Sequence, residues 1–146
     1  MIDTASLQKY SLFGALQGEE IDKLRPFLES AQAAAGDTIV REGEPNDRIY
    51  FIVEGRVAVS KKGVPLLEIG EGETFGEMEL LDVMPTAATI VALAPCQFVT
   101  ISNRAIHGIF HLDTRIFGII IMNLARDLSR RLRAMDEHAA EGRNVR

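Results

Sequence analysis

The segment from Phe75 to Ile90, FGEMELLDVMPTAATI, has the residue types of a site for a small anion. Glycines at 70, 72 and 76 allow the backbone to turn sharply. The residues from Glu77 to Leu81 can then form one helical turn, and free N–H groups at a helix start bind phosphate or carboxylate groups. A glutamate at the mouth of such a site would repel an anion. Glu77 therefore makes sense there only as an acceptor for a ligand hydroxyl or for backbone amides.

The other reactive side chains do not form a second site. His107 and His111 are spaced i, i+4 and share a helix face, with Asp113 nearby, but no second pair completes a metal site. Cys96 follows Pro95 in a turn, and no neighbouring base marks it as a nucleophile. We therefore predict no metal, no cofactor and no catalytic residues, so the chain is not expected to be an enzyme.

Composition limits the class of protein further. A chain of 146 residues with 47% hydrophobic and 25% charged residues is long enough for one folded domain. Its net charge of -5 argues against direct nucleic-acid binding, which usually needs a surplus of Lys and Arg. The N-terminus lacks a signal-peptide pattern, and no apolar run is long enough to span a membrane. We expect a cytoplasmic protein without membrane contact.

The elements that position the site change in character twice along the chain. Residues 1–32 predict short helices, interrupted at Pro26. Residues 33–102 contain short β-branched and aromatic runs between glycine turns, which predicts an eight-stranded antiparallel jelly-roll β-barrel. Residues 103–135 predict C-terminal helices with starts near Ser102 and Asp113, and residues 136–146 are expected to fray. The fold class is mainly β with flanking helices, in one domain over residues 1–135.

The long C-terminal helix carries an apolar stripe in its outer half. Its residues recur at spacings of 4, 3, 4 and 3, and they are Ile121, Ala125, Leu128, Leu132 and Met135. The stripe can pack against the chain's own barrel, or it can form a dimer seam. For the second case the expected interface residues are Ile121, Leu124, Leu128 and Leu132.

These patterns together resemble the cyclic-nucleotide-binding domain of catabolite-activator-type regulators, kinase regulatory subunits and cyclic-nucleotide-gated channels. The resemblance runs from about Leu7 to Met135. Its motifs are the FGE…P-x-A-A-T cassette at 75–89 and a barrel pattern of Gly43, Asp47, Tyr50, Phe51 and Gly55. It implies a jelly roll in which the cassette binds a cyclic phosphate and the C-terminal helix forms a dimer or moves on ligand binding. In activator-type regulators a helix-turn-helix follows this domain, and we expect none here.

The resemblance also implies roles for single residues. The expected ligand-binding set is Phe75, Gly76, Glu77, Met78, Thr86 and Ala87. The resemblance implies that Gly76 and the backbone of Glu77, Met78 and Ala87 face the phosphate. It also implies that the Glu77 side chain holds the ribose 2′-hydroxyl.

Two positions of the cassette depart from the family. The residue after Pro85 is usually an arginine paired with the phosphate, and here it is Thr86; the position of Glu79 is usually Ala or Ser. Losing a charge-assisted hydrogen bond costs about 1.5 to 3 kcal/mol. Arg48, Arg56 or Lys61 are candidates to replace the missing charge.

We therefore expect a stand-alone regulatory module that binds cAMP or cGMP weakly, or a related small ligand, and signals through its C-terminal helix to a second copy or a partner protein. The alternative is a dimeric interaction module whose pocket binds no ligand.

Overall fold

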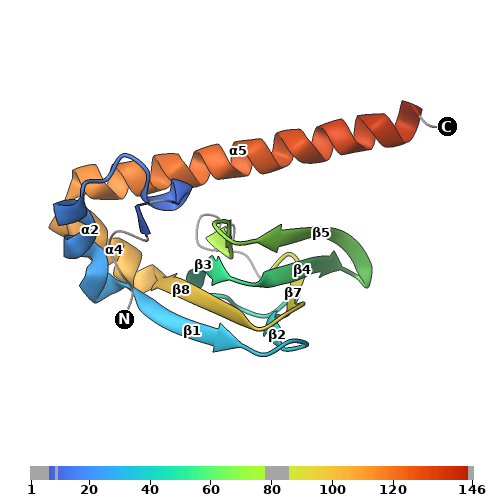
Figure 1. The fold of residues 1–146 in the computed structure, drawn as a ribbon, viewed down its shortest axis with the longest axis horizontal. Helices are drawn as coiled ribbons and strands as arrows, with labels where there is room; N and C mark the ends of the chain where they lie inside the picture. Colours follow the sequence, from blue (N-terminus) through green and yellow to red (C-terminus); the bar gives the residue numbers. More distant parts are fainter. Residues whose placement is uncertain (1–6, 9, 78–85, 145–146) are drawn as a thin grey trace.

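The computed structural model describes residues 7, 8, 10–77 and 86–144, and they form two β-sheets crossed by a long C-terminal helix (Figure 1). One sheet has the strand order β1-β8-β3-β6 and the other β2-β7-β4-β5, and all pairings are antiparallel. The strands are β1 (Glu29–Ala33), β2 (Thr38–Val40), β3 (Arg48–Glu54), β4 (Arg56–Lys61), β5 (Val64–Gly70), β6 (Thr74–Phe75), β7 (Thr89–Ala92) and β8 (Cys96–Ser102). The predicted eight-stranded jelly roll is confirmed, as two facing sheets instead of a closed barrel.

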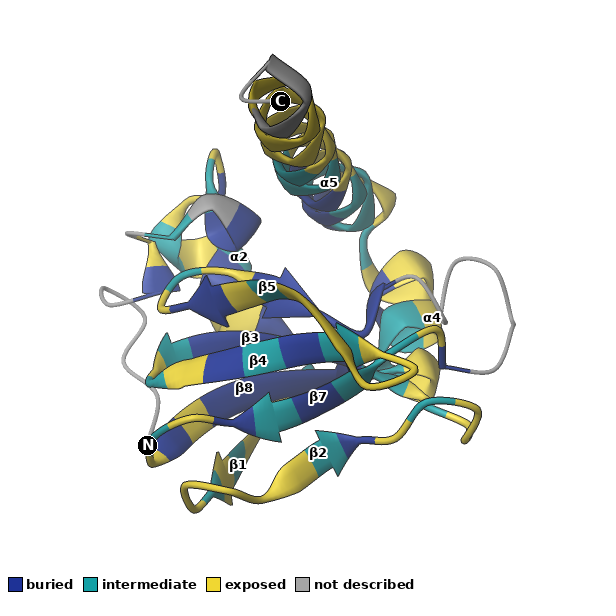
Figure 2. Ribbon diagram, turned by 90° about the vertical axis from the view of Figure 1, so that its right-hand side faces the viewer, coloured by how far each residue is buried: buried dark blue, intermediate teal, exposed yellow. Residues whose placement is uncertain are grey.

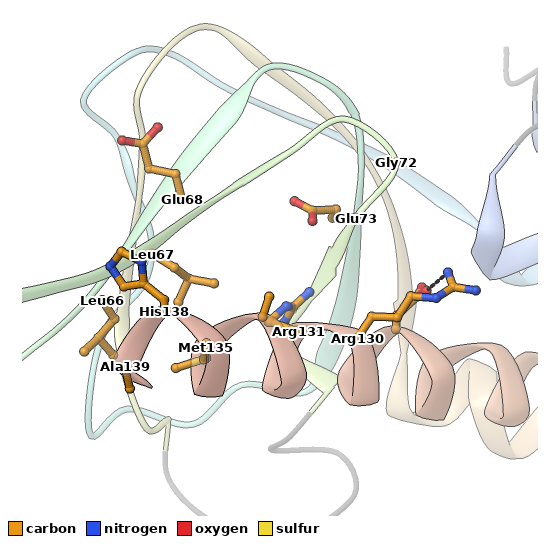
Figure 3. Close-up of a pocket in the computed structure, with 12 residues that line it drawn as sticks. Leu66, Leu67, Glu68, Gly72, Glu73, Arg130, Arg131, Met135, His138 and Ala139 are labelled. Atoms are coloured by element: carbon orange, nitrogen blue, oxygen red, sulfur yellow. Dashed lines mark ion pairs between the residues drawn. The ribbon is translucent and has the colours of Figure 1, made fainter. Parts of the chain in front are cut away.

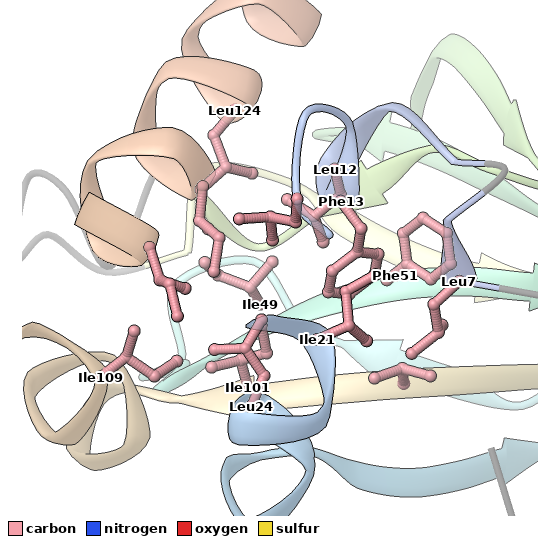
Figure 4. Close-up of a cluster of buried hydrophobic side chains, with 14 residues drawn as sticks. Leu7, Leu12, Phe13, Ile21, Leu24, Ile49, Phe51, Ile101, Ile109 and Leu124 are labelled. Atoms are coloured by element: carbon pink, nitrogen blue, oxygen red, sulfur yellow. The ribbon is translucent and has the colours of Figure 1, made fainter. Parts of the chain in front are cut away.

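Alternation along β3 divides the interior into two apolar cores. Ile49 and Phe51 point toward the helices, whereas Ile52 points between the two sheets. The first core joins the β1-β8-β3-β6 sheet to the helices and contains Leu7, Leu12, Phe13, Leu16, Ile21, Leu24, Val99, Ile101, Ile109, Ile116, Ile120 and Leu124 (Figure 4). This core fixes the inner half of the C-terminal helix on the sheet.

The N-terminal helical segments end where proline chemistry predicts. The 3-10 segment η1 (Ser11–Phe13) is followed by α2 (Gly18–Leu24), and η2 (Arg25–Phe27) contains Pro26. Proline cannot donate a backbone hydrogen bond, so α2 does not continue through it. The first strand then starts at residue 29, four residues before the predicted boundary at 33, because residues 29–33 pair with β8.

The C-terminal helices are α4 (Asn103–Leu112) and α5 (Thr114–Asn144). Ser102 caps α4 by accepting from the Ala105 amide at 3.0 Å, and Asp113 accepts from the Arg115 and Ile116 amides at the start of α5. Both predicted helix starts are thus confirmed.

The expectation that residues 136–146 fray is wrong as far as residue 144, since α5 continues to Asn144. Extending an existing helix needs no new nucleus, and Ala and Glu favour it without any apolar pattern. Figure 2 shows α5 passing from buried to exposed along its length.

Candidate functional site

The predicted site begins where β6 leaves the first sheet. Gly76 follows β6 with φ +86°, and a Cβ there would lie 2.6 Å from the Arg48 carbonyl oxygen. The Asn46 amide donates to the Gly76 carbonyl at 3.3 Å and to the Arg48 carbonyl at 2.9 Å. The sequence suggested that glycine is needed here for contact with a ligand. The structure shows that the chain's own packing also requires it.

Two other predicted side chains are also engaged within the chain. Phe75 is 2% exposed and stacks on Tyr50 with ring centroids 4.8 Å apart, so its side chain belongs to the core. The Thr86 hydroxyl donates to the Glu44 carbonyl, which also accepts from the Thr86 amide at 3.1 Å. A Thr86 hydroxyl bound in this way cannot donate to a ligand without breaking that bond.

Among the remaining predicted residues of the cassette, Ala87 is exposed next to Thr86. Met78 and Glu79 lie outside the described residues, as does the predicted helical turn beyond Glu77.

Glu77 is the buried polar centre of the site. It is 1% exposed, and its Oε1 accepts from the Arg131 Nη1 of α5 at 3.2 Å. The Arg131 Nη2 donates to the Thr74 carbonyl at 2.6 Å. The other carboxylate oxygen, Oε2, is buried and has no hydrogen-bond partner among the residues that the structure describes. Buried carboxylate oxygens are normally bonded, so this one has capacity for a donor.

Burial raises the pKa of Glu77 above its ordinary value of 4.5, because the charged form loses water. The carboxyl's own backbone amide and the positive charge of Arg131 oppose this shift. Arg131 thus compensates only part of the cost of burying the charged Glu77 carboxylate.

A groove of about 650 Å³ lies between β5 and the outer half of α5. Its apolar wall is formed by Leu66 and Leu67 of β5 together with Ala134, Met135 and Ala139 of α5, and the labelled side chains face one another in Figure 3. Its polar lining is Glu68, Gly72, Glu73, Asp127, Arg130, Arg131 and His138. Arg131 lines the groove and also bonds Glu77, so it connects the groove to the predicted site.

The charge near Glu77 does not come from the basic residues proposed from the sequence. Arg48 pairs with Glu29 and Asp47, and Arg56 pairs with Glu68 at 3.1 Å. Lys61 is exposed at the end of β4.

Arg131 was missed, although the sequence contains a signal for it. Leu124, Leu128, Arg131 and Met135 recur at spacings of 4, 3 and 4, which places one arginine on the sheet-facing side of α5.

The predicted dimer residues divide between the core and the surface. Leu124 is 2% exposed inside the first core, so the expectation that it contacts a partner chain is wrong. Ile121 is partly buried against the same core. Leu128 is half-buried, whereas Leu132 is 61% exposed. The prediction fails because α5 is rotated about its axis relative to the expected orientation. Its buried face contains Ile116, Ile120 and Leu124 and lies to one side of the predicted stripe.

The histidine pair and Cys96 do not line this groove. The described part of the chain contains no group of three or more His, Cys, Asp or Glu that could hold a metal ion, and His107 and His111 are exposed. Cys96 is buried and its thiol contacts the Arg56 and Ala94 carbonyls. Among the same residues, no helix is both long enough and apolar enough to cross a membrane.

The described residues thus form a two-sheet jelly roll crossed by a long helix, with a groove between that helix and β5. The model of the cyclic nucleotide-binding domain family matches residues 31–113, more than half of the chain, and the chain belongs to this family. The resemblance inferred from the cassette is thus confirmed.

Relatives support the assignment over different lengths. The cAMP-dependent protein kinase regulatory subunit of Dictyostelium discoideum is 33% identical over 106 residues, covering 67% of this chain and 32% of that protein. A solved cyclic nucleotide-binding domain from Methylobacillus flagellatus has a TM-score of 0.85 at 25% identity, covering 95% of this chain and 81% of the other.

A third relative is also a kinase regulatory subunit. The regulatory subunit of a cAMP-independent protein kinase A from Trypanosoma brucei has a TM-score of 0.72 at 27% identity, covering 84% of this chain and 43% of that one. The chain spans about a third or less of the length of the curated relatives it matches.

Proposed function

We propose that this chain is a regulatory module that binds cAMP, cGMP or a related small anion between the cassette, β5 and α5, and that the bound ligand acts on α5. The family assignment supports the class of ligand. One relative is the regulatory subunit of a cAMP-independent protein kinase A, which is a reason to test the ligand directly.

The observation that carries the proposal is the buried Oε2 of Glu77, which has no hydrogen-bond partner in the described part of the chain. A buried acceptor without a donor costs about 1 to 3 kcal/mol, and a ligand hydroxyl would remove that cost. A cyclic nucleotide offers such a hydroxyl on its ribose. The same molecule carries an anionic phosphate for the backbone near Gly76.

The groove also suits a flat, partly apolar group. Its volume of about 650 Å³ falls within the range of small-molecule sites, and its apolar wall comes from both β5 and α5. A base held against Leu66, Leu67 and Met135 would touch the sheet and the helix at once. Ligand binding would then stabilise the arrangement in which α5 lies over β5.

Calorimetric titration with cAMP and cGMP, at protein concentrations that reveal millimolar binding, tests the proposal. We expect saturable binding in the wild type and weaker binding in Glu77→Ala, because the hydroxyl acceptor is lost. Arg133→Gln is a matched control, since this exposed residue lines neither the groove nor the cassette. Absence of binding by either nucleotide to the wild type would contradict the proposal.

A second candidate function is a ligand-independent dimer formed through α5. It is favoured by the exposure of Leu132 at 61% and Met122 at 56% on a helix otherwise rich in charge. Leu132→Glu should then halve the mass measured by light scattering. An unchanged mass in that variant would exclude a seam through Leu132.

A further inference from the structure

We propose that Arg131, on α5, supplies the positive charge that pairs with the anionic group of the ligand, so that the anion itself fastens the outer half of α5 to the sheet. This inference rests on the proposed function and adds the source of the charge.

The position of the guanidinium carries the argument. Arg131 bonds the Thr74 carbonyl and the Glu77 carboxylate, which lie on either side of Gly76 in the chain. An anion placed against the backbone at Gly76 therefore meets this guanidinium. The side chain is 20% exposed and lines the groove, so a ligand in the groove can reach it.

Arg131 also has donors left for a ligand. A guanidinium carries five N–H groups, and the two bonds found among the described residues use two of them. The remaining three can serve a phosphate without breaking the bonds to Thr74 and Glu77. Arginine is suited to such shared binding because its donors form a flat fork.

The other charged groups of the groove do not compete for this role. Glu68 and Glu73 are acidic, and the Glu73 carboxylate accepts from the Gly70 amide at 2.7 Å. Arg130 is 68% exposed and pairs with Asp127 at 3.5 Å. Arg131 is the cation that contacts the segment from 74 to 77 in the described structure.

This placement has a consequence for regulation. A charge fixed on a loop of the sheet would bind an anion wherever α5 lay, whereas Arg131 binds it only when α5 lies on the sheet. Beyond residue 131 the side chains of α5 are exposed as far as they are described, so few contacts of the chain itself hold that half in place. Anion binding and docking of the outer helix become one event.

The test measures Kd for cAMP and for adenosine, which has the base and ribose but no phosphate, by NMR titration of the full chain. Arg131→Gln should weaken cAMP binding about ten- to hundredfold and leave adenosine binding within about twofold. Arg133→Gln should change neither. If adenosine does not bind the wild type while cAMP does, the phosphate carries the affinity, and Arg131→Gln should abolish cAMP binding.

Three results separate the outcomes. Wild-type protein that binds neither cAMP nor cGMP overturns the proposed function and this inference with it. Wild-type binding with no loss in Arg131→Gln, or with equal losses for cAMP and adenosine, overturns this inference alone. If Arg131→Gln does not fold, Arg131→Lys replaces it: it keeps the charge without the fork, and it should weaken cAMP binding but not adenosine binding.

Discussion

The pair formed by Glu77 and Arg131 predicts a specific pattern of stability changes. Arg131→Gln leaves a carboxylate that is 1% exposed without its charge partner. Removing one partner of a buried ion pair typically costs about 3 to 5 kcal/mol. Arg131 retains 20% exposure, so water can partly replace it, and we expect the lower end of this range, about 3 kcal/mol.

The double variant Glu77→Gln/Arg131→Gln should recover most of that loss. It removes the buried charge as well as its partner, so no uncompensated carboxylate remains in the interior. We expect a coupling free energy of about 3 kcal/mol between the two positions, which leaves the double variant about 1 kcal/mol less stable than the wild type. Glu77→Gln alone should cost about 1 kcal/mol, since Arg131 keeps an uncharged acceptor.

Urea unfolding of the four proteins at pH 7 measures these values. Arg133→Gln controls for the loss of one positive charge from α5 and should stay within about 0.5 kcal/mol of the wild type. Two results would refute the reasoning: a cost below about 0.5 kcal/mol for Arg131→Gln, or a double variant no more stable than that single one. Either would mean that solvent, and not Arg131, balances the charge of Glu77.

Three further predictions use other parts of the site and core. Gly76→Ala should lower the free energy of unfolding in urea by at least about 2 kcal/mol, because the new Cβ would lie 2.6 Å from a backbone oxygen at a residue with φ +86°. Gly63→Ala is the control: its φ is +78° but its Cβ would meet open space, so it should cost about 1 kcal/mol. Burial raises the pKa of Glu77, so the stability that its protonated form contributes is fully present below pH 4.5 and is lost as the pH rises through the folded-state pKa. The free energy of unfolding, measured from pH 4 to 8, should therefore fall in the wild type relative to Glu77→Gln. Parallel curves for the two proteins would contradict this. Leu124→Ala should cost about 2 to 5 kcal/mol and Leu132→Ala under about 0.5 kcal/mol by thermal or urea unfolding, with equal effects excluding the observed face of α5.

The sequence predicted the sheets well because their signals are local. Alternation in RIYFIV places Ile49 and Phe51 on one face and Ile52 on the other, and turn residues mark the strand ends. The end of α5 was mispredicted for a related reason. Its last turns bury nothing, so a search for apolar periodicity finds no helix there, although the composition sustains one.

The site could be predicted only in part. Gly76 and Glu77 could be proposed from the sequence because the cassette is contiguous, and spacing along the chain identifies its members. Arg131 lies 54 residues from Glu77, and it is one of several arginines on α5. Which arginine turns inward depends on the rotation of α5, which the core contacts of Ile116, Ile120 and Leu124 determine. Three-dimensional packing, not residue type, selects Arg131.

The ion pair is hard to explain as a device for stability alone. A buried pair of charges can often be replaced by apolar side chains with no loss of stability. Here burial already raises the pKa of Glu77, and its Oε2 has no hydrogen-bond partner within residues 7, 8, 10–77 and 86–144. A chain selected only to keep its fold could therefore carry two well-packed apolar side chains here without losing stability. A ligand changes the balance, since its hydroxyl would satisfy Oε2 and its anion would use the remaining donors of Arg131. The cost to the empty protein therefore favours a site kept for binding over a pocket kept only as architecture.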